Sequence, residues 1–357
     1  MHQAASCYGL VHKDPKAINR PLNALAIAVT SGNITRMMPR LFITAFLVCL
    51  AVPAWSDEPQ KNDKAQFTRF VEDDQGARLQ TGIATYVNKD GVTVDLIGAI
   101  HIADKAYYEK LNERFTQYDA LLYEMVGEAF EKRVARKKAK EESKELEATP
   151  EETEEAAAGK KLAWLHPLYD TMEKTLGLSG QMRCIDYSKA NFVHADMTMK
   201  EFSDMQNKKN ESFLKLWLSS VVAQMKNPHA APEQPGLLKF MEILCSKDSS
   251  TELRRVLGRM FGSMENMLAG MDTEDGTVIV TERNIVALKV MQDQIKLGQK
   301  NLGVFYGAAH LPDMDKRMQN LGFKRIKSEW LTAWDLPPEP KEQVGDEKPA
   351  PDSKSRP

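Results

Sequence analysis

Two copies of one short motif place a histidine beyond the end of an apolar run. The first copy is GAIHIAD at Gly98–Asp104, and the second is GAAHLPD at Gly307–Asp313. In both, the glycine three positions before the histidine lets the chain bend and lets a ligand approach closely. Imidazole acts as a general base or as a metal ligand. The repeat predicts that His101 and His310 face each other in one site, and the alternative is that each makes only local hydrogen bonds.

A carboxylate and a guanidinium are the candidates to complete this site. Glu124 is the single charge in the apolar run Ala120–Val126. A buried carboxylate is costly unless it is paired or coordinated. Arg283 opens a helical segment that leads to the second motif, and it could aim its guanidinium at the same cleft. Two interpretations of Glu124 follow, as a metal ligand beside both histidines or as the ion-pair partner of Arg283.

The segments around the motifs alternate between strand and helix patterns. A hairpin is predicted at Asn88–Gly91, because Asp-Gly between two β-branched runs favours a tight turn. Asp104 and Asp313 are expected to begin the helices that follow the motifs. Further elements are a helix over Thr281–Leu297, a strand over Asn301–His310 and closing strands near Phe323–Trp334. We predict an α/β fold whose central sheet comes from two related strand-Gly-x-x-His-helix halves, with a helical insertion between them.

The chain divides into segments of different composition. Residues 37–56 have the form of a secretory signal peptide, with Arg40 before a short apolar run and small residues before the cleavage point. Residues 1–36 are interpreted as a mis-called extension, and residues 57–336 as the folded domain. Within it, residues 131–161 are a charged, flexible insertion and residues 164–271 are mostly helical. Residues 337–357 form a disordered, proline-rich tail. The expected location is periplasmic or secreted, with membrane contact only if the signal peptide stays uncleaved.

Charge and cysteine usage narrow the function classes. Forty-eight Lys and Arg balance 50 Asp and Glu, for a net charge of −2, so nucleic acid is not an expected partner. No Gly-x-Ser-x-Gly, phosphate-loop or Cys-x-x-Cys motif occurs. Cys184 and Cys245 are predicted to be either a disulfide or two buried thiols. A helical stripe of methionines indicates a packed face, or alternatively an apolar groove or soft-metal site; it comprises Met260, Met264, Met267 and Met271.

The order of the chemical residues resembles that of a known family. Gly98-x-x-His101, the strand residue Glu124, the segment Glu282–Asn284 and Gly307-x-x-His310 are similar to the TraB/GumN-like family. This family is related to the Tiki metalloproteases and to the erythromycin esterase and ChaN-like fold. The resemblance spans about Thr81 to Trp334. It implies an α/β fold and a site made from both motif histidines and the glutamate, with the arginine contributing.

The residues and the resemblance together suggest a metal-dependent hydrolase. His101, Glu124 and His310 would hold one Mn, Co or Zn ion, and Arg283 would stabilise the developing oxyanion. The substrate would be a peptide or a small molecule. One alternative is a non-enzymatic protein that binds a peptide or haem in the same cleft, and another is a metal-free esterase with a histidine base and Glu124. His194 and Asp196 depart from the family pattern, as either an auxiliary pair or a local turn network.

Overall fold

The computed structural model describes residues 66–142, 165–211, 237–262 and 276–339. The predicted extension and signal peptide lie outside these ranges, as do residues 143–164 and 340–357 and three methionines of the predicted stripe (Met264, Met267 and Met271). The strands are β1 (Thr68–Asp73), β2 (Gly76–Val87), β3 (Thr93–Ala99), β4 (Ile102–Ala103), β5 (Ala120–Tyr123), β6 (Ser179–Gly180), β7 (Phe192–His194), β8 (Asn301–Gly307) and β9 (Lys324–Leu336).

Helices fill most of the remaining described chain. The α-helices are α2 (Lys105–Phe115), α3 (Phe130–Glu142), α5 (Leu165–Leu176), α6 (Gln181–Cys184), α7 (Met199–Lys208), α9 (Leu237–Cys245), α10 (Ser249–Gly262), α12 (Arg283–Lys296) and α13 (Leu311–Asn320). A π-helical turn, η2 (Val278–Glu282), precedes α12, and a 3₁₀ turn, η3 (Ala308–His310), precedes α13.

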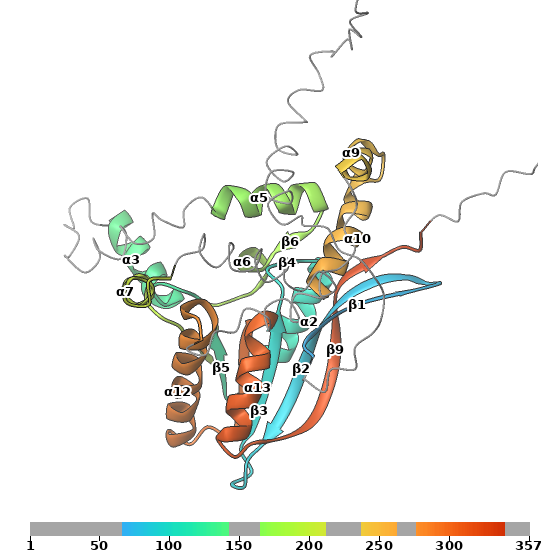
Figure 1. Ribbon diagram of the computed structural model, residues 1–357. Coiled ribbons are helices and arrows are strands. Elements are labelled where there is room, and N and C mark those ends of the chain that lie inside the picture. The colour runs from blue at the N-terminus through green and yellow to red at the C-terminus, as the bar shows by residue number, and fades with distance from the viewer. Residues whose placement is uncertain (1–65, 143–164, 212–236, 263–275, 340–357) are drawn as a thin grey trace, which may run out of the picture.

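A mixed sheet of seven strands forms the centre of this α/β fold (Figure 1). Its order is β1-β2-β3-β8-β5-β7, and β9 pairs with β2. The strands β3, β8, β5 and β7 run parallel, whereas β2 is antiparallel to its neighbours. Although β8 comes late in the chain, it lies between β3 and β5, with Gly307 beside Ala99. The two Gly-x-x-His motifs therefore begin on adjacent parallel strands.

The predicted hairpin joins β2 to β3. The side chain of Asn88 accepts hydrogen bonds from the backbone N–H groups of Asp90 and Val92, both at 2.9 Å. Gly91 has φ +72°, a backbone conformation that glycine adopts without steric cost. The turn prediction is confirmed, and it fixes which faces of β2 and β3 point into the core.

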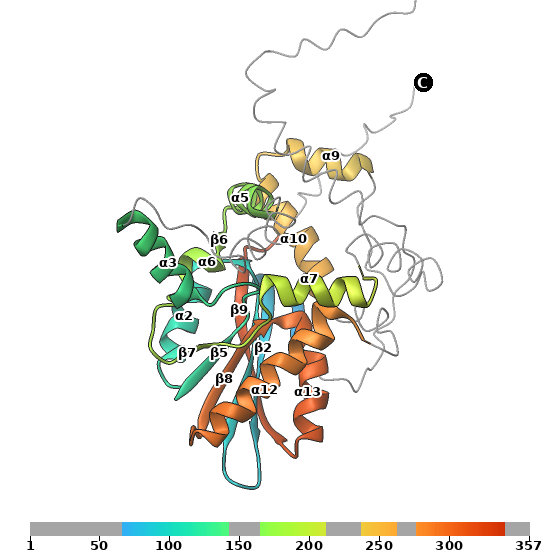
Figure 2. The ribbon, with the colours of Figure 1, turned by 90° about the vertical axis from the view of Figure 1, so that its left-hand side faces the viewer.

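Helices cover both faces of the sheet (Figures 1 and 2). On one face, α12 and α13 enclose a core with β3, β5 and β8 that includes Leu288, Met291, Met314 and Val304. On the other face, α2, α9 and α10 pack on a second core. Met260, the described member of the methionine stripe, packs against this second core, as expected for a packed helix face.

Two predictions about elements need correction. The closing strands are one long strand, β9, which follows β2 from Leu336 to Lys324 with two register shifts. The segment predicted as a helical insert also supplies β7, which pairs with β5 in the central sheet. A strand of three residues is too short for its period to be recognised in a sequence.

The described cysteines differ from both expectations. Cys184 and Cys245 are free thiols, so they do not form a disulfide with each other. Cys184 is half-buried and Cys245 is exposed, so the expectation of two buried thiols is wrong for Cys245. None of the described helices has both the length and the apolar character that crossing a bilayer requires.

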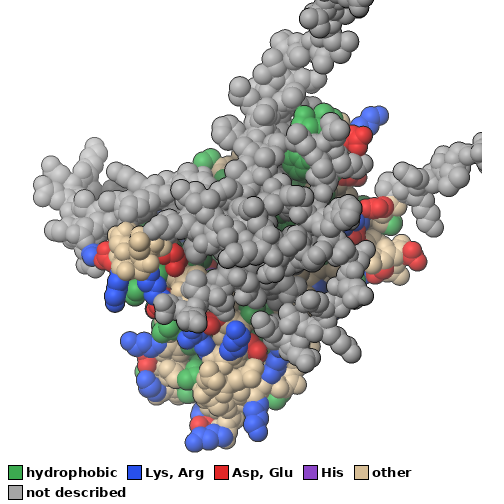
Figure 3. Space-filling view, viewed as in Figure 1, with side chains coloured by type: hydrophobic (Ala, Val, Ile, Leu, Met, Phe, Trp, Pro, Cys, Tyr) green, Lys and Arg blue, Asp and Glu red, His purple; other side chains and the backbone are tan. Residues whose placement is uncertain are grey.

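Charged side chains of both signs occupy the lower end of the face shown in Figure 3. This end carries α12 and the β2–β3 turn. It lies at the opposite end of the sheet from the carboxyl ends of β3, β5 and β8, where the motif residues gather.

Candidate functional site

The carboxyl ends of three neighbouring parallel strands bring the predicted site residues together. His101 follows β3, His310 follows β8, and Glu124 directly follows β5. The backbone N–H of Glu124 donates to the carbonyl of Phe305 at 3.1 Å, which continues the β5–β8 pairing to that residue. Because β8 is the middle strand of the three, the strands that lead to His101 and Glu124 flank the one that leads to His310. The two motif histidines and Glu124 therefore follow neighbouring strands at the same edge of the sheet.

Gly307 lies at the point of convergence. A Cβ added to it would stand 3.2 Å from Glu124 Oε2, 3.6 Å from His310 Cδ2 and 4.0 Å from His101 Nε2. The backbone N–H of Gly307 also donates to Glu124 Oε2 at 2.6 Å. All three side chains therefore surround the space that any larger residue at this position would fill.

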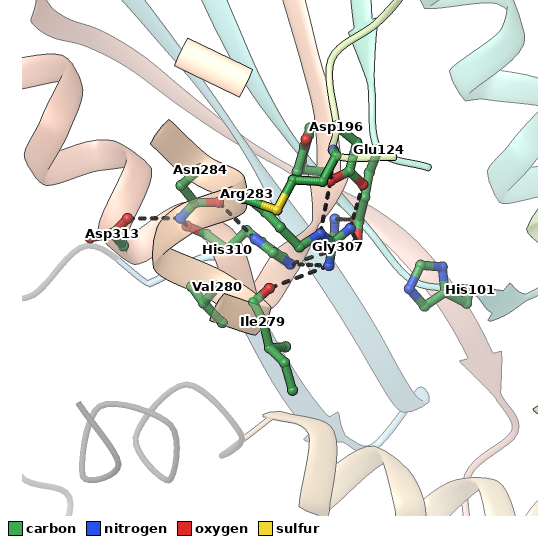
Figure 4. Close-up of polar contacts among 12 residues, drawn as sticks. His101, Glu124, Asp196, Ile279, Val280, Arg283, Asn284, Gly307, His310 and Asp313 are labelled. Carbon is green, nitrogen blue, oxygen red and sulfur yellow. Dashed lines mark hydrogen bonds and ion pairs between the residues drawn. The ribbon is translucent and has the colours of Figure 1, made fainter. Parts of the chain in front are cut away.

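Arg283 binds Glu124 and a second carboxylate that the sequence did not predict as its partner (Figure 4). Its Nη2 donates to Glu124 Oε1 at 2.6 Å and to Asp196 Oδ2 at 2.6 Å, and its Nε donates to Asp196 Oδ1 at 2.9 Å. Its Nη1 lies 3.3 Å from the carbonyl of Ile279 and 3.4 Å from His310 Nε2. These contacts use all five N–H groups of the guanidinium.

The π-helical turn explains how Arg283 reaches this position. Thr277 caps η2, since its side chain accepts from the N–H of Val280 at 3.2 Å. The turn then places Arg283 at the first position of α12, where the helix dipole disfavours a cation. The two carboxylates offset that cost. Isolated π-helical turns are frequent at functional sites, and this one ends at the arginine.

The charges of this cluster shift one another's protonation. Burial alone would raise the pKa of Glu124, but the charge of Arg283, the positive charges of His310 and His101 when those rings are protonated, and the Gly307 N–H outweigh it and hold this pKa well below its usual range. Burial and the nearby charge of Glu124 raise the pKa of Asp196, although Arg283 opposes them. Asp196 is the more deeply buried of two carboxylates that share one guanidinium, so it retains a proton more readily than Glu124 does.

His310 is a neutral imidazole with a defined tautomer. Burial, reinforced by Arg283, lowers the pKa of His310 to about 4. The amide nitrogen of Asn284 donates to the carbonyl of His310 and to Asp313, which leaves the amide oxygen as the acceptor for His310 Nδ1 at 2.7 Å. The ring proton therefore lies on Nδ1, and Nε2 presents its lone pair towards Arg283 and Glu124.

His101 has the same tautomer for a parallel reason. Its Nδ1 lies 3.1 Å from Gln181 Oε1, and the amide nitrogen of Gln181 donates to the hydroxyl of Tyr187. The amide oxygen is therefore the acceptor, and Nε2 of His101 carries a lone pair on the side of Gly307. His101 is exposed, whereas His310 is buried. In Figure 4 it lies beside the Arg283 cluster without a drawn bond to it.

Both motif aspartates lie at the start of a helix, as predicted, but neither caps its helix through its side chain. Asp104 occupies the position before α2 but makes no side-chain cap; it accepts from the N–H of Asp335 and so holds the end of β9. Asp313 lies inside the first turn of α13, since His310 precedes that helix. Its carboxylate accepts from Asn284 at 2.8 Å and Arg317 at 2.7 Å. Asp313 thereby orients the amide that sets the tautomer of His310.

Three residues of the cluster were not predicted as partners. Asp196, Asn284 and Gln181 each bind a predicted site residue through a polar side chain. Only one feature of the sequence pointed to any of these partners. Arg283 and Asn284 are consecutive polar residues that interrupt an otherwise apolar helix start. His194 and Asp196 do not act as a pair, since His194 Nε2 contacts the carbonyl of Met125 at 2.7 Å. Glu282 pairs with Lys209 at 2.6 Å and takes no part in the cluster.

The predicted metal set is not assembled in this arrangement. Two Nε2 lone pairs and a carboxylate are donors that first-row divalent ions bind. Within the described ranges, however, no group of three or more His, Cys, Asp and Glu is placed to hold a metal ion. The guanidinium of Arg283 contacts both Glu124 Oε1 and His310 Nε2, and a second cation there would be repelled.

The predicted oxyanion role of Arg283 also needs correction. Its side chain is buried and each of its N–H groups already has a partner. It therefore positions Glu124 and Asp196 and has no donor left for a substrate oxygen.

Comparisons of the chain with protein-family models, with curated proteins and with solved structures returned no match.

Proposed function

We propose that this protein is a hydrolase that cleaves an acyl bond, in a peptide or an ester, by activating water beside Gly307. The observation that supports the proposal is the shared tautomer of His101 and His310, each fixed by an amide on Nδ1, which leaves Nε2 of His101 on the side of Gly307 and Nε2 of His310 in contact with Arg283. An unprotonated imidazole nitrogen accepts a proton from water, and a fixed carboxylate stabilises the imidazolium that forms. In this proposal the two Gly-x-x-His units act as two halves of one site.

The proposed roles of the two histidines follow from their exposure to solvent. His101 is the exposed histidine, so we assign it as the general base that takes the proton of the attacking water. Glu124 is held as a carboxylate by Arg283 and by the N–H of Gly307, and it stabilises the protonated base. Buried His310 contacts Arg283 and fills the inner wall of the site. The resemblance to the TraB/GumN-like family suggests peptides as substrates.

The test is hydrolysis of fluorescent casein and of p-nitrophenyl acetate by protein dialysed against EDTA. We expect turnover without added metal, and a loss of about 100-fold or more in kcat for His101→Ala, the usual contribution of a general base. His194→Gln is the matched control, because His194 lies at the same sheet edge but its ring contacts the carbonyl of Met125 and the ring of Tyr123. Wild-type rates in His101→Ala would reject the proposal.

The same assay tests the predicted divalent cation. Mn, Co or Zn would be held by His101, Glu124 and His310 after Arg283 released Glu124, and the bound cation would acidify a water molecule. Turnover that appears only after one of these ions is restored would favour that version. Tight retention of a peptide or haem without turnover would favour the non-enzymatic alternative.

A further inference from the structure

The helix α5 lies against the segment that carries His101. The helix α5 contacts both β4 and β6, and β4 pairs with β6 through Ile102 and Gly180. Gln181 follows β6 directly, donates its N–H to the carbonyl of His101 at 2.8 Å and orients the imidazole through its side chain. The segment from α5 to Gln181 therefore both covers and positions the proposed base.

One aromatic residue of α5 faces this base. The ring of Tyr169 is edge-on to the ring of His101, with centroids 6.1 Å apart and an interplanar angle of 86°. Tyr169 is 36% exposed, among the few large hydrophobic residues of the described chain that remain so accessible. Partial burial and the charge of Glu124 raise the pKa of Tyr169, so its hydroxyl keeps its proton at neutral pH.

The hydroxyl of Tyr169 is also an uncommitted donor beside the proposed base. Arg283 uses all its N–H groups, Gln181 donates to Tyr187, and His310 donates to Asn284. Within the part of the chain that the structure describes, the Tyr169 hydroxyl makes no hydrogen bond. Acyl hydrolysis requires a donor for the oxygen on which negative charge develops, and the side-chain donors of Arg283 and His310 are already engaged.

We propose that Tyr169 is a catalytic residue whose hydroxyl donates a hydrogen bond to the acyl oxygen of the substrate, on the opposite side of the reacting carbon from the water that His101 activates. This inference rests on the proposed hydrolase function and adds to it the donor that Arg283 cannot supply. In the balanced step, the water oxygen bonds to the acyl carbon, its proton moves to His101 Nε2, and the carbonyl π electrons move to the acyl oxygen. Collapse of this intermediate breaks the bond to the leaving group, which receives the proton from His101.

The decisive variant is Tyr169→Phe, which removes one oxygen and keeps the ring that packs on His101. We expect kcat for p-nitrophenyl acetate to fall about 100-fold with KM changed less than about threefold, as for loss of one oxyanion donor. Thr171→Val is the matched control, because it removes a hydroxyl from the same helix that bonds only to the carbonyl of Pro167. The control is expected to keep wild-type kcat. A Tyr169→Phe variant with wild-type kcat would overturn the proposal.

A second readout does not depend on turnover. Benzyl trifluoromethyl ketone hydrates in water to a neutral tetrahedral gem-diol, which resembles the intermediate without the charge that Glu124 would repel. Its binding is followed by fluorine NMR of the probe. We expect Tyr169→Phe to bind it at least tenfold more weakly than the wild type and Thr171→Val to bind it equally.

The two readouts separate the two proposals. If the wild type binds the probe in a Tyr169-dependent way but hydrolyses neither substrate, the hydrolase function fails and the role of Tyr169 in ligand recognition stands. If the wild type hydrolyses the ester and Tyr169→Phe matches it in both assays, the function stands and the Tyr169 proposal fails. Absence of probe binding to the wild type, together with absence of turnover, overturns both.

Discussion

Gly307 is the residue whose lack of a side chain the site requires. Its φ is −46° and its ψ is 132°, so an alanine could adopt the same backbone conformation. The requirement is instead steric, because an added Cβ would stand 3.2 Å from Glu124 Oε2 and reach the space in front of His101. The repeat of Gly-x-x-His in the sequence identified this glycine, but only the strand order explains its role.

We predict that Gly307→Ala lowers kcat by at least tenfold while the free energy of unfolding falls by about 1 to 3 kcal/mol. The added methyl displaces the carboxylate and narrows the path to His101. Gly82→Ala is the control, since its Cβ would meet Phe67 Cα at the same 3.2 Å but away from the site. It should lower stability and keep kcat per folded molecule. Equal kcat for Gly307→Ala and the wild type would contradict this account.

Arg283 is important for stability as well as for the site. We predict that Arg283→Met lowers the free energy of unfolding by about 3 to 5 kcal/mol, because two buried carboxylates lose their shared partner. Adding Asp196→Asn to Arg283→Met removes one of the two charges and should recover part of the loss. Urea unfolding at pH 7 measures both variants. If Arg283→Met unfolds at the same urea concentration as the wild type, the buried cluster does not stabilise the fold.

At the scale of elements, β8 is the strand that assembles the site. Its place between β3 and β5 depends on non-local pairing, which no local pattern encodes. The hairpin at Asn88–Gly91 and the helix after each motif were predictable, because turn residues and helix periodicity are local signals. The sequence left two interpretations of Glu124, as a metal ligand or as the ion-pair partner of Arg283, and its pairing with Arg283 was one of them. Asp196 was missed as the partner of Arg283, because the short strand β7 that places it carries too weak a signal.

The position of α13, which begins directly after His310, depends on a buried hydrogen bond to the sheet. The hydroxyl of Tyr86 on β2 donates to Asp315 on α13, and both residues are buried. We predict that Tyr86→Phe lowers the free energy of unfolding by about 1 to 3 kcal/mol, since Asp315 loses a buried donor. Tyr86→Phe combined with Asp315→Leu should lose less than the sum of the two single changes. Additive effects in this double-mutant cycle would show that the two residues do not interact energetically.

For the whole molecule, the buried neutral histidine predicts a specific dependence of stability on pH. The pKa of His310 is lowered to about 4, mainly by burial, whereas an unfolded histidine titrates near pH 6.5. Between these values the unfolded chain binds a proton that the folded chain does not, so stability falls as pH falls through this window. Above about pH 6.5 the contribution is fully present, and below about pH 4 both states are protonated and no further loss arises from this residue.

We predict that the wild type loses about 2 to 3 kcal/mol of unfolding free energy from His310 between pH 7 and pH 4.5, a loss that His310→Asn lacks. The charged or titratable groups that act on the His310 ring remain in both proteins; they are Glu124, Arg283, His101 and Asp313. The difference between the two curves of unfolding free energy against pH therefore comes from the histidine. Glu124 adds only about 0.4 kcal/mol of loss by pH 4.5, because its lowered pKa reduces stability mainly below the ordinary pKa of a glutamate. Urea unfolding at half-unit pH steps measures both curves. Parallel curves for the two proteins would mean that His310 takes up its proton in the folded state as readily as in the unfolded state.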